Sequence, residues 1–347
     1  MNQIIFFDST LRDGSHAVGH QLSVTDIREY CRNIDGAGLH TVIVGHGNGL
    51  GASSLQVGLS AITDKEMLKT ARKELKRTKL GAFLIPGFGT INDDINPAID
   101  IGVDLFCVAT HCTEADVTRQ HIEYLRKKNK ETYGVLMMYH MASKERLVEE
   151  ALKIQSYGAQ GVIIMDSAGA STPDMVSETI SHLSRNIEIK VGFHAHNNMG
   201  LAIATSLIAI QNGALIIDGT LRGFGAGAGN CQLEALVGLL LKMGISTGLD
   251  LYKMMDVSDN IVSKIMKKPQ EVSSISLISG IAGVFSGFAN HVKEAAERFK
   301  VDPRDIFMEL GRRKMVAGQE DFIVDVAMYL ASKKSSEKES YDIESLL

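Results

Sequence analysis

Eight short apolar segments recur along the chain before residue 251, and helical periodicity follows them. The apolar segments are Ile4–Phe7, Thr41–Val44, Lys79–Ile85, Leu105–Ala109, Gly134–Met138, Gly161–Met165, Ile189–His194 and Leu215–Asp218. The clearest amphipathic stretches are Thr25–Ala37, Lys65–Lys76, Val117–Lys128, Lys144–Tyr157, Asp174–Arg185, Gly200–Asn212 and Gln232–Met243. A short apolar run followed by a period near 3.6 predicts a strand and then a helix. Eight such units favour an α/β fold, a (β/α)8 TIM barrel, over an open sheet.

The alternation stops near residue 251, and only helical patterns follow, for example Ser286–Phe299 and Ile306–Met315. A length of 347 residues suits one large domain with a small appendage. We therefore predict a catalytic barrel at 1–251 and a helical C-terminal domain at 252–331. The remaining stretch, 332–347, is predicted to be a disordered tail, because its polar run lacks apolar periodicity.

Charge balance and cysteine content restrict the compartment and the partners. The chain has 36 Lys and Arg against 41 Asp and Glu, which gives a net charge of -5 and no electrostatic footprint for nucleic acid or an anionic membrane. No apolar stretch of signal-peptide or membrane-span length precedes Asp8. The four cysteines are few and scattered. We predict a reduced, cytoplasmic protein with a small-molecule partner, and neither a nucleic-acid nor a membrane partner.

His194 and His196 form a His-x-His pair at the end of the seventh predicted strand. Residues two apart on a strand share a face, so both imidazoles can bind one metal ion. Such a pair is also common as two polar side chains at a strand end that bind no metal. Asp13 follows the first predicted strand, and a barrel brings it to the pair. We predict a metal site of Asp13, His194 and His196. The remaining alternative is that Arg12 and Asp13 form a structural ion pair in the first loop.

In a TIM barrel, reactive groups lie at the C-terminal ends of the strands. Polar residues follow most of the predicted strands: His16, His46, Asn48, His111, Glu114, His140, Asp166 and Ser167. From the residues alone, Asp166 and Ser167 are better explained as helix N-caps or hydrogen-bonding residues that support a loop than as reacting groups. The glycine-rich segment 223–230 resembles a phosphate cradle, but close packing at a barrel mouth accounts for it equally well.

A two-histidine, one-carboxylate set leaves positions on a divalent ion open for substrate. A 2-oxo acid can chelate such an ion, so that negative charge on its carbonyl oxygen is stabilised during C–C cleavage. Arg12 adds a second positive charge. His16, three residues beyond Asp13, is the candidate general base, because imidazole titrates near neutral pH.

Four strings carry a resemblance to a known family: TLRDGSH at 10–16, GHGNGLGASS at 45–54, ATHCTEAD at 109–116 and GRRKMVAGQED at 311–321. Over nearly its full length the chain resembles the DRE-TIM metallolyases, and within them the 4-hydroxy-2-oxovalerate aldolases of aromatic meta-cleavage pathways. The last two strings carry most of the subfamily assignment.

This resemblance implies a class II, metal-dependent pyruvate aldolase. Asp13, His194 and His196 would bind a divalent ion, with Mn²⁺ preferred over Mg²⁺ or Co²⁺. Arg12 would stabilise the pyruvate enolate, and His16 would deprotonate the 4-hydroxyl group. Cleavage of C3–C4 would release acetaldehyde and pyruvate. Substrate contacts are expected from Arg12, Ser167 and His194.

One stretch of the helical domain and residue 48 depart from the family pattern, and residue 230 is left without an assigned role. The family has two tyrosines in a GYAGVYSS stretch, whereas residues 280–287 read GIAGVFSG, so that Phe285 stands where a phenol would donate a hydrogen bond. The preferred aldehyde and the stereochemistry therefore stay open. Asn48 replaces a common Asp. Asn230 ends the glycine-rich segment and is also found in the wider family.

Two rival functions remain. Acyl-CoA Claisen enzymes of the isopropylmalate synthase and hydroxymethylglutaryl-CoA lyase type share the Arg-Asp and His-x-His elements, but not the two subfamily strings. The loss of both tyrosines would also fit a non-catalytic scaffold that docks a dehydrogenase. The resemblance further implies an acylating acetaldehyde dehydrogenase as a possible partner of the helical domain, and we expect a homo-oligomer.

Overall fold

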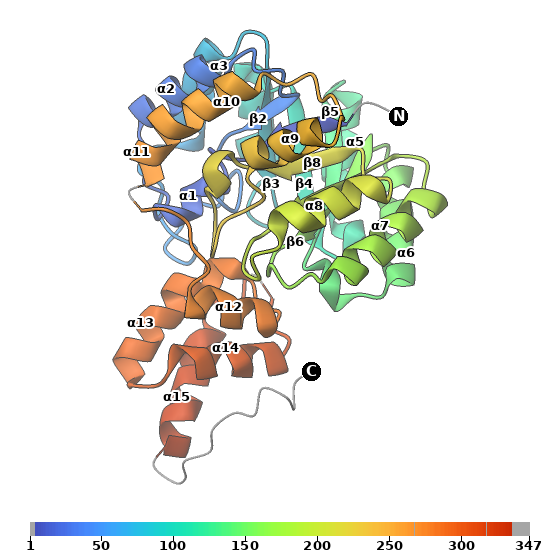
Figure 1. The fold of residues 1–347 in the computed structure, drawn as a ribbon. Helices are drawn as coiled ribbons and strands as arrows, with labels where there is room; N and C mark the ends of the chain where they lie inside the picture. The colour runs from blue at the N-terminus through green and yellow to red at the C-terminus, as the bar shows by residue number, and fades with distance from the viewer. Residues whose placement is uncertain (1–3, 267, 317, 335–347) are drawn as a thin grey trace.

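The computed structural model describes residues 4–266, 268–316 and 318–334. Eight parallel strands pair in sequence order and close into a barrel, which confirms the predicted fold (Figure 1). The strands are β1 (Ile5–Asp8), β2 (Thr41–Ile43), β3 (Lys79–Leu84), β4 (Leu105–His111), β5 (Glu131–Met137), β6 (Gly161–Asp166), β7 (Lys190–Ala195) and β8 (Ile216–Gly219). Pairing of β1 with β8 closes the barrel, so the first loop lies beside the last.

Helices surround the barrel. They are α1 (Gly14–Ala17), α2 (Val24–Ile34), α3 (Asp64–Glu74), α4 (Asn96–Ile101), α5 (Arg119–Lys127), α6 (Lys144–Ser156), α7 (Pro173–Asn186), α8 (Ala202–Gln211) and α9 (Leu233–Lys242), with short helical turns η1 (Ile91–Ile95), η2 (Ala115–Thr118), η3 (Tyr139–Met141) and η4 (Leu221–Gly223). Several begin at a Ser or Thr whose hydroxyl accepts a backbone N–H three residues later, as at Ser23, Thr63, Ser143 and Thr172. These caps explain where the predicted helices start.

Alternation along the strands divides the apolar side chains between two layers. In β1, Phe6 packs in the layer between sheet and helices, whereas Phe7 belongs to the barrel interior with Ile43, Phe83 and Ile163. The interior is therefore a packed core and not a channel. Polar chemistry is left to the C-terminal ends of the strands.

The barrel core extends beyond the predicted boundary at residue 251. Helix α10 (Leu251–Val257) contacts α2 and α9, and it is followed by η5 (Ser258–Val262) and α11 (Ser263–Met266). Met254, Val262 and Met266 belong to the same apolar cluster as the barrel helices. The short segment after residue 251 thus packs on the barrel, because its apolar side chains cover the helices there.

A separate helical unit lies at one end of the barrel, shown in orange and red in Figure 1. It contains α12 (Ser274–Ile281), η6 (Ser286–Phe288), α13 (Ala289–Phe299), α14 (Pro303–Arg312) and α15 (Phe322–Lys334). Its own apolar core includes Val284, Phe288 and Phe307. Within the described residues, no helix combines the length and apolar composition needed to cross a membrane.

The predicted disordered tail begins too early. Residues 332–334 continue α15, where the Ser332 hydroxyl donates to the carbonyl of Tyr329. The polar side chains of Ser332 and Lys333 are accommodated because both residues are exposed to solvent. The rest of the predicted tail, 335–347, lies outside the described residues.

Candidate metal centre and active site

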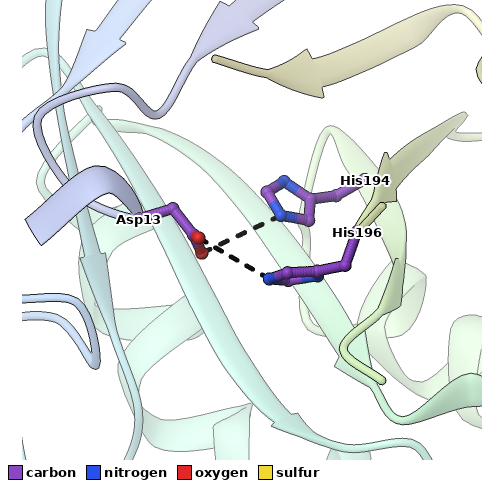
Figure 2. Close-up of side chains that lie close together, drawn as sticks. All are labelled: Asp13, His194 and His196. Carbon is purple, nitrogen blue, oxygen red and sulfur yellow. Dashed lines mark ion pairs between the residues drawn. The ribbon is translucent and has the colours of Figure 1, made fainter. Parts of the chain in front are cut away.

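Three side chains predicted as metal ligands meet at the C-terminal end of the barrel (Figure 2). The Nε2 atom of His194 lies 3.9 Å from one Asp13 oxygen, and that of His196 lies 3.5 Å from the other. One ligand atom from each residue fits within a mutual distance of 4.8 Å. All three side chains are buried, at 2% exposure for Asp13, 0% for His194 and 4% for His196.

Strand geometry explains the convergence. His194 lies in β7 and His196 directly follows it, so their side chains emerge on the same face. Asp13 precedes α1, in a turn where its backbone N–H donates to the carbonyl of Ser9. Because the parallel strands close into a barrel, the end of β1 reaches the end of β7 across the mouth.

Each imidazole is oriented by a hydrogen bond on its other nitrogen. Nδ1 of His194 donates to Asp218 at 2.8 Å, and Nδ1 of His196 donates to the carbonyl of Asp166 at 2.9 Å. Both Nε2 atoms are then buried without a hydrogen-bond partner. Because buried polar atoms are rarely left unpaired, the two lone pairs beside a carboxylate fit a divalent ion. Asp13, His194 and His196 therefore offer the ligand atoms that a divalent metal site requires.

Arg12 contributes a second positive charge at the same place. Its Nη1 donates to Asp13 at 2.6 Å, and its guanidinium lies 4.5 Å from the centroid of the Phe83 ring. Burial opposes ionisation of Asp13, yet Arg12 and the two histidines hold the pKa of that carboxyl well below its ordinary value. The ion pair considered from the sequence is therefore present, within the candidate site itself.

His16 lies on α1, at the edge of this cluster. Burial is the main cause that lowers the pKa of His16 to about 4; Asp13 opposes this shift, and the nearby His46 and Arg12 add to it. The ring stands edge-on to Phe285, with centroids 6.4 Å apart. A neutral imidazole near pH 7 can accept a proton, as the predicted general base must.

Two cavities meet at this point. A small inner cavity of about 70 Å³ is lined by Arg12, Asp13, His16 and His196 together with apolar side chains. An outer cavity of about 740 Å³ lies between the barrel mouth and the helical unit. His16, Asn48, Ala226 and Phe285 line both cavities, so Phe285 stands between the cluster and the outer space.

The turn that carries Phe285 is attached to three barrel loops. The Asn198 amide donates to the Ser286 hydroxyl at 3.0 Å, and the Ser286 N–H donates to the carbonyl of Ser167 at 3.1 Å. Nε2 of His140 donates to the carbonyl of Gly283 at 3.1 Å. These contacts fix the helical unit to the ends of β5, β6 and β7.

Ser167 and Asn230 were predicted near the site. The Ser167 hydroxyl accepts a hydrogen bond from the Met138 N–H, and the residue lines neither cavity. Its contact with substrate stays a prediction. Asn230 pairs through its backbone with His196, and both polar atoms of its buried side chain lack a partner. The carboxylate of Asp166 accepts hydrogen bonds from the N–H groups of Ala170 and Ser171, as expected of a residue that supports its loop.

The glycine-rich segment 223–230 lies against the cluster of Asp13, His194 and His196. The Ala226 N–H donates to Asp13 at 3.0 Å. A Cβ at Gly225 would lie 2.6 Å from the Asn230 amide, and one at Gly229 would lie 2.0 Å from the carbonyl of Gly223. Close approach of backbone therefore accounts for these glycines.

Two residues of the site were not singled out from the sequence. Asp218 is the second-last residue of β8 and binds His194, and its place near a strand end could have revealed it. Asn198, two residues beyond His196, binds a residue of another unit, and no local pattern predicts that contact. Conversely, His46 accepts the Asn48 N–H and donates to the carbonyl of Gly58, and so has no free nitrogen for substrate.

Comparison with known proteins gives two family matches. The model of the HMGL-like family matches residues 3–261. The model of the DmpG-like communication domain matches residues 270–332. The first match covers the barrel with α10, and the second covers the helical unit.

Individual relatives are similar over nearly the whole chain. A 4-hydroxy-2-oxovalerate aldolase of Spirochaeta aurantia is 54% identical over 330 residues, which cover 95% of this chain and 97% of that protein. The 4-hydroxy-2-oxovalerate aldolase of Pectobacterium atrosepticum is 50% identical, over 97% of this chain and 98% of that protein.

Solved structures share the fold. The carboxyl transferase domain of Rhizobium etli pyruvate carboxylase, with pyruvate and biocytin, superposes with a TM-score of 0.81 at 17% identity. The match covers 96% of this chain and 61% of that one. At this identity the likeness concerns architecture alone.

Proposed function

Because the chain belongs to the HMGL-like family, we propose that it is a divalent-metal-dependent aldolase that cleaves 4-hydroxy-2-oxovalerate to pyruvate and acetaldehyde. The names of the relatives, at 50–54% identity over most of the chain, support this activity. The observation that carries the proposal is the buried cluster of Asp13, His194 and His196, with two unpartnered Nε2 atoms, beside Arg12 and a neutral His16. This set matches the needs of an enolate-forming cleavage.

Asp13, His194 and His196 would hold the ion, and we propose Mn²⁺, with Mg²⁺ and Co²⁺ as alternatives. The unpartnered amide of Asn230 beside His196 is the candidate for an additional oxygen ligand. When bound, a divalent ion supplies Lewis-acid chemistry that polarises the carbonyl of a 2-oxo acid.

The chain's own residues account for the proton and charge transfers. His16 takes the proton of the 4-hydroxyl group, and the electrons of that O–H bond form the aldehyde C=O as C3–C4 breaks. The electron pair of the broken bond moves into the pyruvate enolate, whose oxygen Arg12 stabilises. A proton then returns to C3. Ser167 and His194 are the other proposed substrate contacts.

The inner cavity favours this chemistry because much of its wall is apolar. Phe83, Ile85, Phe88, Met137, Met165 and Phe285 line it together with the charged groups. An apolar wall lowers the local dielectric, which strengthens the interaction of Arg12 with the developing negative charge.

The two rivals differ from this proposal in what they release. A Claisen enzyme would release free coenzyme A from an acyl-CoA, and a scaffold would release nothing. The DmpG-like communication domain favours the aldolase. It also supports a separate partner, for which we propose an acylating acetaldehyde dehydrogenase bound through the helical unit. Homo-oligomerisation stays a prediction. The four buried, free cysteines agree with the proposed cytoplasmic location.

Retro-aldol turnover tests the proposal. The full chain is freed of metal by a chelator and then assayed with racemic 4-hydroxy-2-oxovalerate, with and without Mn²⁺, while pyruvate and acetaldehyde are both measured. We expect equal amounts of the two products with Mn²⁺, and a rate at least about a hundredfold lower without metal, since the ion stabilises the charge that develops. Release of coenzyme A from an acyl-CoA, or no pyruvate from any 4-hydroxy-2-oxoacid, would refute it.

A further inference from the structure

A buried carboxylate that the proposed mechanism does not use lies behind the metal cluster. Asp218 is the second-last residue of β8 and is 3% exposed. One of its oxygens accepts Nδ1–H of His194 at 2.8 Å, and the other accepts the Ser9 hydroxyl at 2.7 Å. Nη2 of Arg12 lies 3.8 Å from the oxygen that binds His194. Asp218 thus contacts a candidate metal ligand and lies next to the candidate enolate stabiliser.

The barrel backbone determines where this carboxylate lies. In the parallel register, Asp218 is paired with His194 on β7 and with Phe7 on β1. Residues paired in register project to the same face of a sheet. Asp218 therefore points to the barrel axis from between the strands that precede Asp13 and carry His194. It lines neither cavity, so it acts through its neighbours.

The two histidines are held by acceptors of different charge. A carboxylate holds His194, whereas the neutral carbonyl of Asp166 holds His196. Hydrogen bonds to an ionised acceptor are about twice as strong as neutral ones. They also raise the basicity of the ligating nitrogen and fix its tautomer. The Nε2 atoms of His194 and His196 are the two candidate metal-binding nitrogens. That of His194 is consequently the more strongly polarised.

We infer that Asp218 is a positioning residue, which orients His194 and strengthens its Nε2 as a metal ligand while keeping the Arg12 guanidinium beside the site. The inference rests on the metal site of the proposed function. It assigns to the end of β8 a share of the metal affinity, although β8 itself supplies no ligand.

Metal affinity, measured without substrate, tests this role. The metal-free full chain is titrated with Mn²⁺, and free Mn²⁺ is followed by its electron paramagnetic resonance signal. The matched control is Asp8→Asn, which removes a buried carboxylate at the end of β1 that binds Tyr30 and Thr10 instead of a metal ligand. A folding defect would lower the number of binding sites, whereas a positioning role changes the dissociation constant Kd of the sites that remain.

We expect Asp218→Ala to raise the Kd for Mn²⁺ by about 10- to 100-fold. Asp218→Asn, which keeps an acceptor but loses the charge, should raise it by roughly three- to tenfold. Asp8→Asn should stay within about twofold of the unmodified chain. An increase for Asp218→Ala of less than about threefold, or an equal increase for Asp8→Asn, overturns the inference.

Two further results would also be decisive. If Asp218→Ala does not fold, Asp218→Asn takes its place, and a Kd within about twofold of the unmodified chain overturns the inference. If the unmodified chain binds no Mn²⁺, the inference fails together with the metal site. Mn²⁺ binding without pyruvate formation refutes the aldolase alone, because the Kd values still report on Asp218.

Discussion

The barrel mouth and the turn that carries Phe285 face each other across the inner cavity, and they are built differently. At the barrel mouth, buried carboxylates are paired: Asp13 with the Arg12 guanidinium, and Asp218 with Nδ1–H of His194. The turn is attached by neutral hydrogen bonds, from Asn198 to Ser286 and between the backbones of Ser286 and Ser167. One region holds charge, and the other holds an apolar side chain.

This difference leads us to expect that the barrel mouth governs the chemical step and that the turn governs substrate selectivity. Removing one partner of a buried ion pair costs about 3–5 kcal/mol, because the other charge is left uncompensated. A neutral hydrogen bond contributes about 0.5–1.5 kcal/mol. The barrel residues are thus constrained together, whereas each hydrogen bond that attaches the turn contributes less. Changes at the mouth should affect the rate of the reaction, and changes at the turn should affect which substrate is preferred.

Removal of the proposed base should have the largest effect. We expect His16→Ala to lower kcat by about 10²- to 10⁴-fold, the usual contribution of general base catalysis, at saturating Mn²⁺. Steady-state kinetics of pyruvate formation measure the change. His182→Ala on α7 is the matched control and should retain full activity. A loss of less than about tenfold in His16→Ala would mean that another group takes the proton.

The pH profile sharpens this prediction. Because burial lowers the pKa of His16 to about 4, its neutral form persists as the pH falls from 7 and is lost only as the pH passes through about 4. We expect kcat/KM at saturating Mn²⁺ to stay flat down to about pH 5, well below the ordinary range of histidine. An acid limb with its midpoint at about pH 6.5 would contradict the assignment.

Loosening the turn should have an intermediate effect. Asn198→Ala leaves the Ser286 hydroxyl and the Ala228 N–H without their buried partner, which costs about 1–3 kcal/mol. We expect KM to rise by about tenfold while kcat stays within about threefold, since Phe285 is displaced but the metal cluster is intact. Asn186→Ala, which removes an exposed amide on α7 that donates to the carbonyl of His182, is the control. A fall in kcat with an unchanged KM would disprove the separation.

The sequence predicts the barrel and the metal cluster because both depend on local patterns. Short apolar runs mark the strands, and His194 and His196 share a face of β7 wherever the strand is placed. Strand β5 starts at Glu131, three residues before its predicted start at Gly134. The prediction missed this beginning because Glu131 and Thr132 are polar and do not extend the apolar run. The fold was therefore predictable in outline, and strand ends less so.

Contacts between distant segments were not predictable in the same way. Asn198 meets Ser286 across 88 positions of sequence, and Ser9 meets Asp218 across 209. Neither pair has a spacing that a helix or strand period would reveal. The packing of α10 and α11 on the barrel depends likewise on which apolar face finds a partner, and this is decided by the tertiary structure.

The smallest predicted effect comes from restoring a phenol at the turn. Phe285 packs edge-on to Phe288, with ring centroids 5.6 Å apart, and lines both cavities. Phe285→Tyr adds a single hydroxyl to this ring. One hydrogen bond to substrate is worth about 0.5–1.5 kcal/mol, so kcat/KM for one enantiomer of 4-hydroxy-2-oxovalerate should rise about two- to tenfold over the other.

Separate assays of the two enantiomers measure this ratio, with Phe299→Tyr on α13 as the control. Phe299 lies on the helical unit but lines neither cavity, so its hydroxyl should leave the ratio unchanged. An enantiomer ratio for Phe285→Tyr equal to that of the unmodified chain would show that the turn does not select the substrate. Selectivity would then have to come from the apolar wall of the barrel, where Phe83, Ile85, Phe88, Met137 and Met165 line the inner cavity.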